Sequence, residues 1–165
     1  MSLHIQTARL SLRPFAMPDA DEVFACITPG MTRFMAWDPP TREAYQTRCE
    51  ALVRDGGRAE TQFVIRRADT GECLGVTAVE RPGDELPELG IWMKEAAHGQ
   101  GYGREAVEAT LRWASAQGDR AGFLYPVAVE NVASRRIAER LGGEIIGSRA
   151  GAKYDAVVYR IPALR

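Results

Sequence analysis

The chain has 165 residues, of which 45% are hydrophobic and 26% are charged, and its formal net charge is -1. This length favours one domain, residues 1–165, with a core that needs neither disulfides nor metal ions. The near balance of charge argues against a partner made of nucleic acid, which normally selects a basic excess. No apolar run is long enough to span a bilayer and no secretory signal is recognisable, so we expect a cytoplasmic protein without a membrane partner.

The first third of the chain predicts one strand and two helices. Residues 5–15 alternate apolar and polar side chains, which is typical of a strand. Residues 19–28 open with a capping pattern and predict a short helix. Residues 31–40 are aromatic and rich in turn residues, so we expect a loop. Residues 41–55 carry an apolar stripe and predict a second helix that ends at paired glycines.

The middle of the chain changes to a period of two residues. Strands are predicted at residues 62–67, 73–80 and 86–94, and the short turns between them indicate an antiparallel meander. The pattern then returns to helix at residues 104–117.

The last third predicts a strand at residues 123–129, a helix at 131–141 and two closing strands at 144–146 and 156–161. The order of elements is therefore strand, two helices, three strands, helix, strand, helix and two strands. This order predicts an α/β fold of the α+β kind, with a single mixed, mostly antiparallel sheet of about seven strands and four helices on both faces.

A glycine-rich loop, residues 98–103, lies between a predicted strand and a predicted helix. The free N–H groups and positive dipole of a helix start, reached by backbone without Cβ atoms, form a phosphate cradle. The glycines alone fit a plain strand-to-helix turn equally well. A dinucleotide site needs Gly-x-Gly-x-x-Gly in a parallel unit, and a mononucleotide loop ends in Gly-Lys-Ser or Gly-Lys-Thr; the chain has neither pattern.

Three segments together resemble the GNAT superfamily of acyl-CoA-dependent N-acyltransferases, and in particular its ribosomal-protein N-acetyltransferase branch. They are residues 88–106, the Asn-x-x-Ser helix at 129–142 and the opening segment at 7–14. The resemblance spans nearly the whole chain. It departs at His98, where the superfamily pattern begins with Gln or Arg. The family fold implies a sheet that splays between its fourth and fifth strands.

The resemblance implies that acetyl-CoA is the co-substrate and that backbone N–H groups of the loop hold its pyrophosphate. A backbone N–H near Trp92 or Met93 would polarise the thioester carbonyl. Asn131 is expected to bond the pantetheine arm or to cap its own helix, and Arg135 to meet a phosphate or to stay in solvent. The residues expected to contact the cofactor are Ile91, Trp92, Met93, His98, Gln100, Gly101, Tyr102, Gly103, Arg104, Asn131 and Arg135.

The reaction needs an amine that is neutral when it attacks, so a base must take its proton. Glu88 matches the glutamate position common in the branch and is the first candidate, with Glu80 second; the alternative for both is a solvated surface carboxylate. Ser134 matches the family position proposed to return a proton to the CoA thiolate, and its alternative is a hydroxyl that caps backbone N–H groups. With two histidines and no Cys-x-x-Cys, we expect no metal site.

The acceptor site is expected between the first two helices, the loop at residues 31–40 and the final hairpin. Phe34, Trp37 and Asp38 are its candidate lining, or else form a hydrophobic plug over the sheet. We rank a protein or peptide α-amine first as the acceptor and a small amine second. Transfer of a longer acyl group and a non-catalytic acyl-CoA-binding module remain alternatives. By analogy with the family, a homodimer is an expectation.

Overall fold

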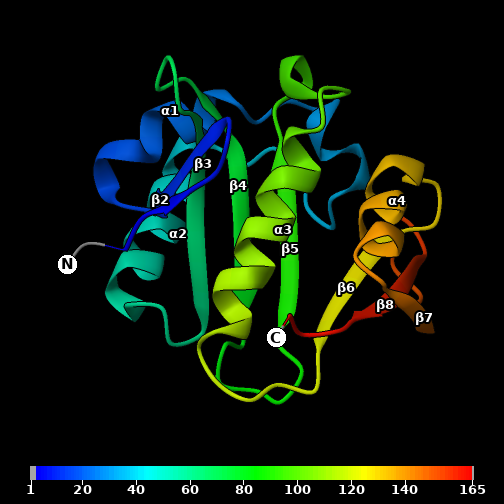
Figure 1. Ribbon diagram of the computed structural model, residues 1–165. Coiled ribbons are helices and arrows are strands. Elements are labelled where there is room, and N and C mark those ends of the chain that lie inside the picture. Colours follow the sequence, from blue (N-terminus) through cyan, green and yellow to red (C-terminus); the bar gives the residue numbers. More distant parts are fainter. Residues whose placement is uncertain (1–2, 165) are drawn as a thin grey trace.

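The computed structural model describes residues 3–164. They form a mixed α/β fold built on one eight-stranded sheet in the order β1-β2-β3-β4-β5-β6-β8-β7 (Figure 1). The strands are β1 (Ile5–Gln6), β2 (Leu10–Pro14), β3 (Glu60–Arg67), β4 (Cys73–Glu80), β5 (Glu88–Met93), β6 (Phe123–Ala128), β7 (Glu144–Arg149) and β8 (Ala156–Ile161). All neighbouring strands are antiparallel except β5 and β6, so the predicted fold class is confirmed.

The sheet has one strand more than expected because the opening strand is a hairpin. β1 and β2 pair with each other, with Ile5 opposite Leu12. The turn between them is closed by Thr7, whose backbone N–H donates to the Leu10 carbonyl at 3.0 Å and whose hydroxyl oxygen accepts the Leu10 N–H at 2.9 Å. A threonine side chain that competes for backbone bonds in this way ends one strand and starts the next.

Four α-helices cover the sheet, two on each face (Figure 1). They are α1 (Ala20–Ala25), α2 (Arg42–Asp55), α3 (Tyr102–Ser115) and α4 (Val132–Arg140). The predicted ends of the second helix are confirmed: the Thr41 hydroxyl accepts the Ala44 N–H at 3.1 Å, and Gly56 ends the helix with a φ of 65°. The loop predicted at residues 31–40 contains a short 3-10 helix, η2 (Met31–Phe34).

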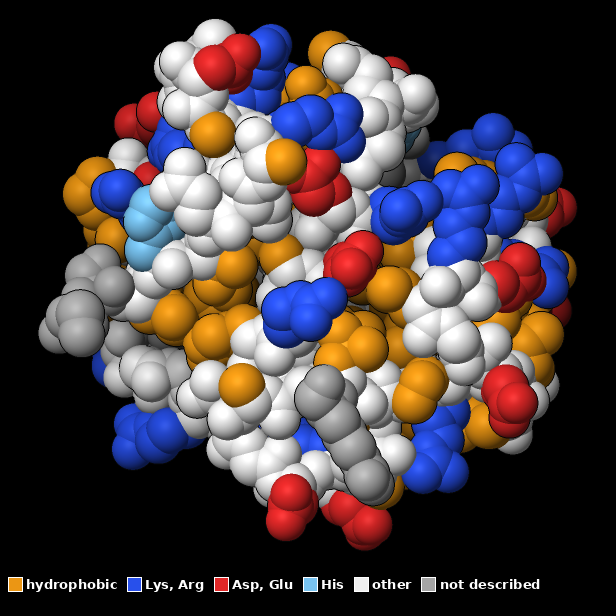
Figure 2. Space-filling model, in the orientation of Figure 1, with side chains coloured by type: hydrophobic (Ala, Val, Ile, Leu, Met, Phe, Trp, Pro, Cys, Tyr) orange, Lys and Arg blue, Asp and Glu red, His pale blue; other side chains and the backbone are white. Residues whose placement is uncertain are grey.

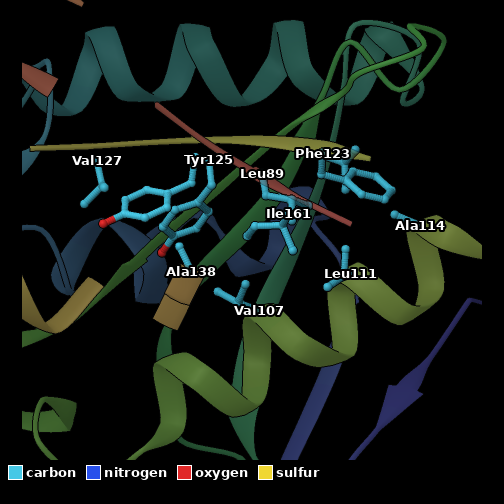
Figure 3. Packing of buried hydrophobic residues seen from close by; sticks show 11 residues of the cluster. Leu89, Val107, Leu111, Ala114, Phe123, Tyr125, Val127, Ala138 and Ile161 are labelled. Atoms are coloured by element: carbon cyan, nitrogen blue, oxygen red, sulfur yellow. The ribbon is translucent and has the colours of Figure 1, made fainter. Parts of the chain in front are cut away.

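The alternation of side chains along the central strands decides which helices each residue meets. Val79 and Leu89 lie opposite each other and face α3, where they pack with Val107, Leu111 and the inner residues of β6 (Figure 3). The neighbouring positions in the same strands face α1 and α2. The sheet therefore carries one large core under α3 and α4, and the other face is left for α1, α2 and the loop between them.

β5 and β6 diverge immediately after they meet (Figure 1). Their only Cα pairing among the described residues is Glu88 with Leu124, next to the bond from the Leu124 N–H to the Pro87 carbonyl at 2.9 Å. Beyond this point the backbone of β5 has no strand on the β6 side. The expected splay between the fourth and fifth long strands is thus present.

Within residues 3–164, no helix has the length and apolar character needed to cross a membrane.

Candidate active site

The loop at residues 98–103 has the backbone shape that only glycine adopts readily. Gly99 and Gly101 have φ values of 75° and 80°, and α3 begins at Tyr102 directly after them. The first N–H groups of α3 therefore point out of the helix start, and the glycines place no Cβ of their own in front of them. A phosphate cradle would need this backbone geometry, and phosphate binding at the loop stays a prediction.

Arg9, in the turn between β1 and β2, holds this loop in place. Its guanidinium donates to the Gln100 carbonyl at 2.9 Å and to Glu105 Oε2 at 2.7 Å, and it lies 4.5 Å above the Tyr102 ring. Glu105, in the first turn of α3, also accepts the Thr7 hydroxyl at 2.6 Å. These contacts lower the pKa of Glu105 against the opposing effect of burial. In the sequence Arg9 stands out only as part of the segment at residues 7–14, and its contacts with the loop are not apparent there.

Gly103 marks the point where the loop, β5 and α4 come together. A Cβ placed on it would lie 3.5 Å from Ile137 of α4, 3.8 Å from Ile91 and 3.9 Å from Met93. His98 contributes a bond from its ring Nε2 to the Met93 carbonyl at 2.8 Å. The side chain of Gln100 donates to the Ala96 carbonyl at 3.1 Å. Five of the residues expected to contact the cofactor thus lie together at the open side of β5: Ile91, Met93, His98, Gln100 and Gly103.

The ladder between β4 and β5 decides which backbone groups of β5 are free. The Lys94 N–H donates to the Leu74 carbonyl, and in an antiparallel pair every second residue does the same. Trp92 therefore directs its N–H toward β4, and Ile91 and Met93 direct theirs toward the side where β6 has diverged. Of the two groups expected to polarise a thioester carbonyl, the Met93 N–H lies on the open edge and the Trp92 N–H does not.

Ser134 lies in the first turn of α4, facing β6. Its hydroxyl is 2.6 Å from the hydroxyl of Tyr125, and its N–H donates to the Asn131 side chain at 3.3 Å. Asn131 thus caps α4, as one of its two expected roles requires. Burial raises the pKa of Tyr125 to about 12, so this phenol keeps its proton at neutral pH. Tyr125 could not be recognised as a partner of Ser134 from the sequence, because its pattern is that of a core residue in a buried strand.

The two predicted arginine contacts differ in their surroundings. Arg135 donates to the Tyr159 hydroxyl and to the Val129 carbonyl, both at 3.1 Å, so two hydrogen bonds fix its guanidinium at the protein surface. Arg104 is exposed at the start of α3. Basic side chains gather over α4 on the face that carries α3 (Figure 2), where α4 itself contributes Arg135, Arg136 and Arg140. This positive charge lies next to the loop and suits a ligand with several phosphate groups.

The opposite face of the sheet holds a pocket of about 420 Å³, which we call the sheet pocket. Its walls come from α2 and from Met35, Trp37, Asp38 and Pro40 of the α1–α2 loop. Its floor consists of residues that lie opposite one another in β3, β4 and β5 and share one face: Glu60, Gln62, Val76, Ala78, Glu80, Gly90 and Trp92. Trp37 and Trp92 meet edge to face, with ring centroids 6.5 Å apart.

Three glutamates form a row across the floor of this face, because Glu80 lies opposite both Glu60 and Glu88. Glu60 accepts from Arg48 at 3.0 Å, and Glu88 accepts from Arg81 at 2.9 Å and from Arg149 at 3.1 Å. Within residues 3–164, no side chain donates to Glu80. Burial raises the pKa of Glu80, and the charges of Glu88 and Glu60 raise it further. Glu80 also lines the sheet pocket, whereas Glu88 does not.

The predicted acceptor residues divide between two hollows. Trp37 and Asp38 line the sheet pocket. Phe34 lines a second hollow of about 540 Å³, the hairpin pocket, which lies between the α1–α2 loop and Lys153 and Tyr154 of the β7–β8 turn. Asp38 borders both hollows.

Over residues 3–164, no group of histidine, cysteine or carboxylate side chains has the arrangement of a metal site.

Comparisons with known proteins agree with this geometry. Residues 9–144 match the family model described as an acetyltransferase (GNAT) domain. The ribosomal-protein-serine acetyltransferase of Escherichia coli (strain K12) is 28% identical over 112 residues, which cover 67% of this chain and 60% of that protein. This chain therefore aligns with less than two thirds of the length of that relative.

Two solved structures show the same fold. One is an acetyltransferase (GNAT family) from Bacillus anthracis, with a TM-score of 0.84 at 19% identity, covering 98% of this chain and 99% of that one. The other is RimL, a ribosomal L7/L12 alpha-N-protein acetyltransferase in complex with coenzyme A, with a TM-score of 0.84 at 18% identity, covering 97% and 98%. At these identities the likeness extends to the fold alone.

Proposed function

The chain belongs to the GNAT family of acetyltransferases, and we propose that it transfers an acetyl group from acetyl-CoA to a primary amine within a ternary complex. One observation carries the proposal. The glycine loop, the open edge of β5 and the Ser134 hydroxyl lie around the point where β5 and β6 diverge. The sheet pocket, whose floor carries carboxylates, lies on the other face of β5. An acyl donor and an amine can thus approach β5 from opposite sides.

Each group has a role in this reaction. A carboxylate takes one proton from the ammonium of the acceptor, and the neutral nitrogen forms a bond to the thioester carbon. The Ile91 and Met93 N–H groups stabilise the negative charge that develops on the carbonyl oxygen. The bond from carbon to sulfur then breaks, the nitrogen releases its second proton to water, and the thiolate takes a proton from Ser134. Solvent resupplies that proton while Tyr125 stays hydrogen-bonded to the serine oxygen.

Glu80 and Glu88 are the two candidates for the base. Both lie about 10 Å before Ile91 along the strands, at roughly 3.3 Å per residue, so either carboxylate receives the proton through water. The raised pKa of Glu80 and its place in the sheet pocket support it over Glu88, which two arginines already bind. We therefore propose Glu80 as the base and keep Glu88 as the alternative.

A direct test is release of free CoA thiol from acetyl-CoA in the presence of a panel of primary amines, with mass spectrometry of the products. The proposal expects an N-acetylated amine in amounts that match the thiol released. Tight binding of acetyl-CoA without transfer to any amine would support the alternative, a non-catalytic acyl-CoA-binding module.

Replacing Arg9 by alanine is expected to raise the KM for acetyl-CoA about tenfold and to leave kcat nearly unchanged. The variant loses the bonds that fix the Gln100 carbonyl and Glu105, so the loop N–H groups are held less well. Steady-state kinetics with acetyl-CoA as the varied substrate measures the change. Arg13→Ala, which removes an exposed arginine from β2, is the matched control. Equal KM values in the two variants would contradict the role of Arg9.

Replacing Ser134 by alanine is expected to lower kcat about tenfold, and Tyr125→Phe to lower it by a smaller factor. The double variant should be no slower than Ser134→Ala, because the two hydroxyls act through one hydrogen bond. The measurement is kcat at saturating substrates, with KM values as a check on binding. If Ser134→Ala keeps full turnover, its hydroxyl serves only the structure of α4.

A further inference from the structure

The sheet pocket has the size and walls of a small-molecule site. Its volume of about 420 Å³ lies within the range of roughly 300–1,000 Å³ that is usual for such sites. The floor is hollow at its centre because Ala78 and Gly90 lie opposite each other there. Trp37, Trp92 and Tyr45 provide aromatic surface around this hollow. The walls therefore suit a flat apolar group of modest size.

The charges in the sheet pocket select for a cation. Glu60, Glu80 and Asp38 all line it, and Arg48 is its one basic residue. Arg48 is bonded to Glu60, and Asp38 is bonded to Lys153, which leaves Glu80 without a cationic partner among the described residues. The negative charge of Glu80 would attract an ammonium group, which reaches the carboxylate through water as in the proposed proton transfer. Trp92 and its neighbour Trp37 lie toward the other end of the floor. A carboxylate on the ligand would be repelled by the same row.

A clasp separates the sheet pocket from the hairpin pocket. The Lys153 ammonium donates to the Thr32 carbonyl at 2.8 Å, to the Trp37 carbonyl at 3.2 Å and to Asp38 Oδ1 at 2.7 Å. These bonds tie the β7–β8 turn to the α1–α2 loop at the residue that borders both hollows. A polypeptide with its first residue in the sheet pocket would have to break this clasp to continue into the larger hollow.

From these three features we infer that the acceptor is a small primary amine with one cationic end, a flat apolar body and no carboxylate. The inference rests on the proposed function and names the substrate class of the same site. It reverses the order suggested by the sequence, which ranked a protein or peptide α-amine first.

The first arm of the test compares four acceptors at pH 7.5 with acetyl-CoA saturating: phenethylamine, phenylalanine, a pentapeptide that begins with serine, and putrescine. The inference expects kcat/KM for phenethylamine to exceed that of each other acceptor at least tenfold, and that of phenylalanine about 100-fold. A preference for the pentapeptide, putrescine or phenylalanine would overturn the inference while acetyl transfer itself stands. No transfer to any of these acceptors, or to a wider amine panel, would overturn the proposed function instead.

The second arm fills the pocket. A Cβ on Gly90 meets no atom within 4 Å, so Gly90→Leu should fold and project its side chain into the hollow. We expect the KM for phenethylamine to rise more than tenfold and the KM for acetyl-CoA to stay unchanged. Gly83→Leu is the matched control, because Gly83 is equally free of contacts but lies in the turn after β4, outside the pocket. Equal phenethylamine KM values in Gly90→Leu and wild type would place the acceptor elsewhere.

Discussion

Glu80→Gln is expected to lower kcat about 100-fold and to leave the KM for acetyl-CoA unchanged. A general base contributes on the order of 100-fold or more, and glutamine keeps the size of the side chain but takes up no proton. The loop at residues 98–103, which we propose as the pyrophosphate site, lies on the other face of the sheet, so binding of the donor should not change. Initial rates at saturating acceptor, with each substrate varied in turn, measure both constants.

The pH dependence gives a second readout for Glu80. Because burial and two neighbouring carboxylates raise the pKa of Glu80, its protonation should set the acidic limb of the wild-type rate profile above the usual glutamate range. The Glu80→Gln variant should lack that limb. A wild-type profile that stays flat down to the ordinary pKa of glutamate would argue against this residue.

The same raised pKa predicts a gain in stability for Glu80→Gln. A carboxyl whose folded pKa exceeds its unfolded pKa stabilises the fold at low pH, and this contribution is lost as pH rises through the folded value. At neutral pH the wild-type protein therefore retains an unfavourable charge that glutamine removes. We expect a higher melting midpoint for the variant at pH 7 and a difference that shrinks toward pH 4. A gain in stability with a loss of activity is typical of a functional site.

Glu88→Gln is the matched comparison, one strand away in the same row. It weakens the bonds to Arg81 and Arg149 and should lower the melting midpoint. If Glu80 is the base, Glu88→Gln should lower kcat much less than Glu80→Gln. The opposite order of effects would assign the base to Glu88, as the resemblance to the family first suggested.

Local patterns were sufficient to predict most of the fold. Residues 73–80 and 156–161 match β4 and β8 at both ends, because turn residues flank clear runs of strand formers. The start of α2 at Thr41 and its end at the paired glycines were predicted equally well. The Thr7 turn was missed because one threonine side chain, not a glycine or proline, divides the opening strand.

The local geometry of the candidate site could be predicted only where it depends on neighbours in sequence. The loop at residues 98–103 and the Asn131 cap are local features, and the sequence contains them in full. The contact of Tyr125 with Ser134, the hold of Arg9 on the loop and the row of three glutamates all depend on strand register and helix placement. Strand register and helix placement determine which residues meet across the fold, and the spacing of residues within one segment does not reveal either of them.

Gly101→Val is expected to lower kcat/KM for acetyl-CoA about 100-fold, mainly through KM. Gly101 has a φ of 80° at the start of α3, where an ordinary residue costs roughly 1–2 kcal/mol and a β-branched residue costs more. The loop must therefore change shape, and its N–H groups then no longer form the site that we propose for the pyrophosphate. A 100-fold loss corresponds to about 2.7 kcal/mol, which the strain and the lost phosphate bonds together can supply.

Two further variants separate backbone shape from general strain. Asparagine tolerates the left-handed region, so Gly101→Asn should lose much less affinity than Gly101→Val, although a Cβ there lies 3.3 Å from the Arg9 guanidinium. Gly71 has a φ of 76° in the turn between β3 and β4, with no atom near its Cβ. Gly71→Val should therefore lower the melting midpoint as Gly101→Val does and leave the KM for acetyl-CoA unchanged. If both valine variants raised that KM equally, the loss at Gly101 would reflect weakened folding. That result would contradict a role of the loop in binding the pyrophosphate.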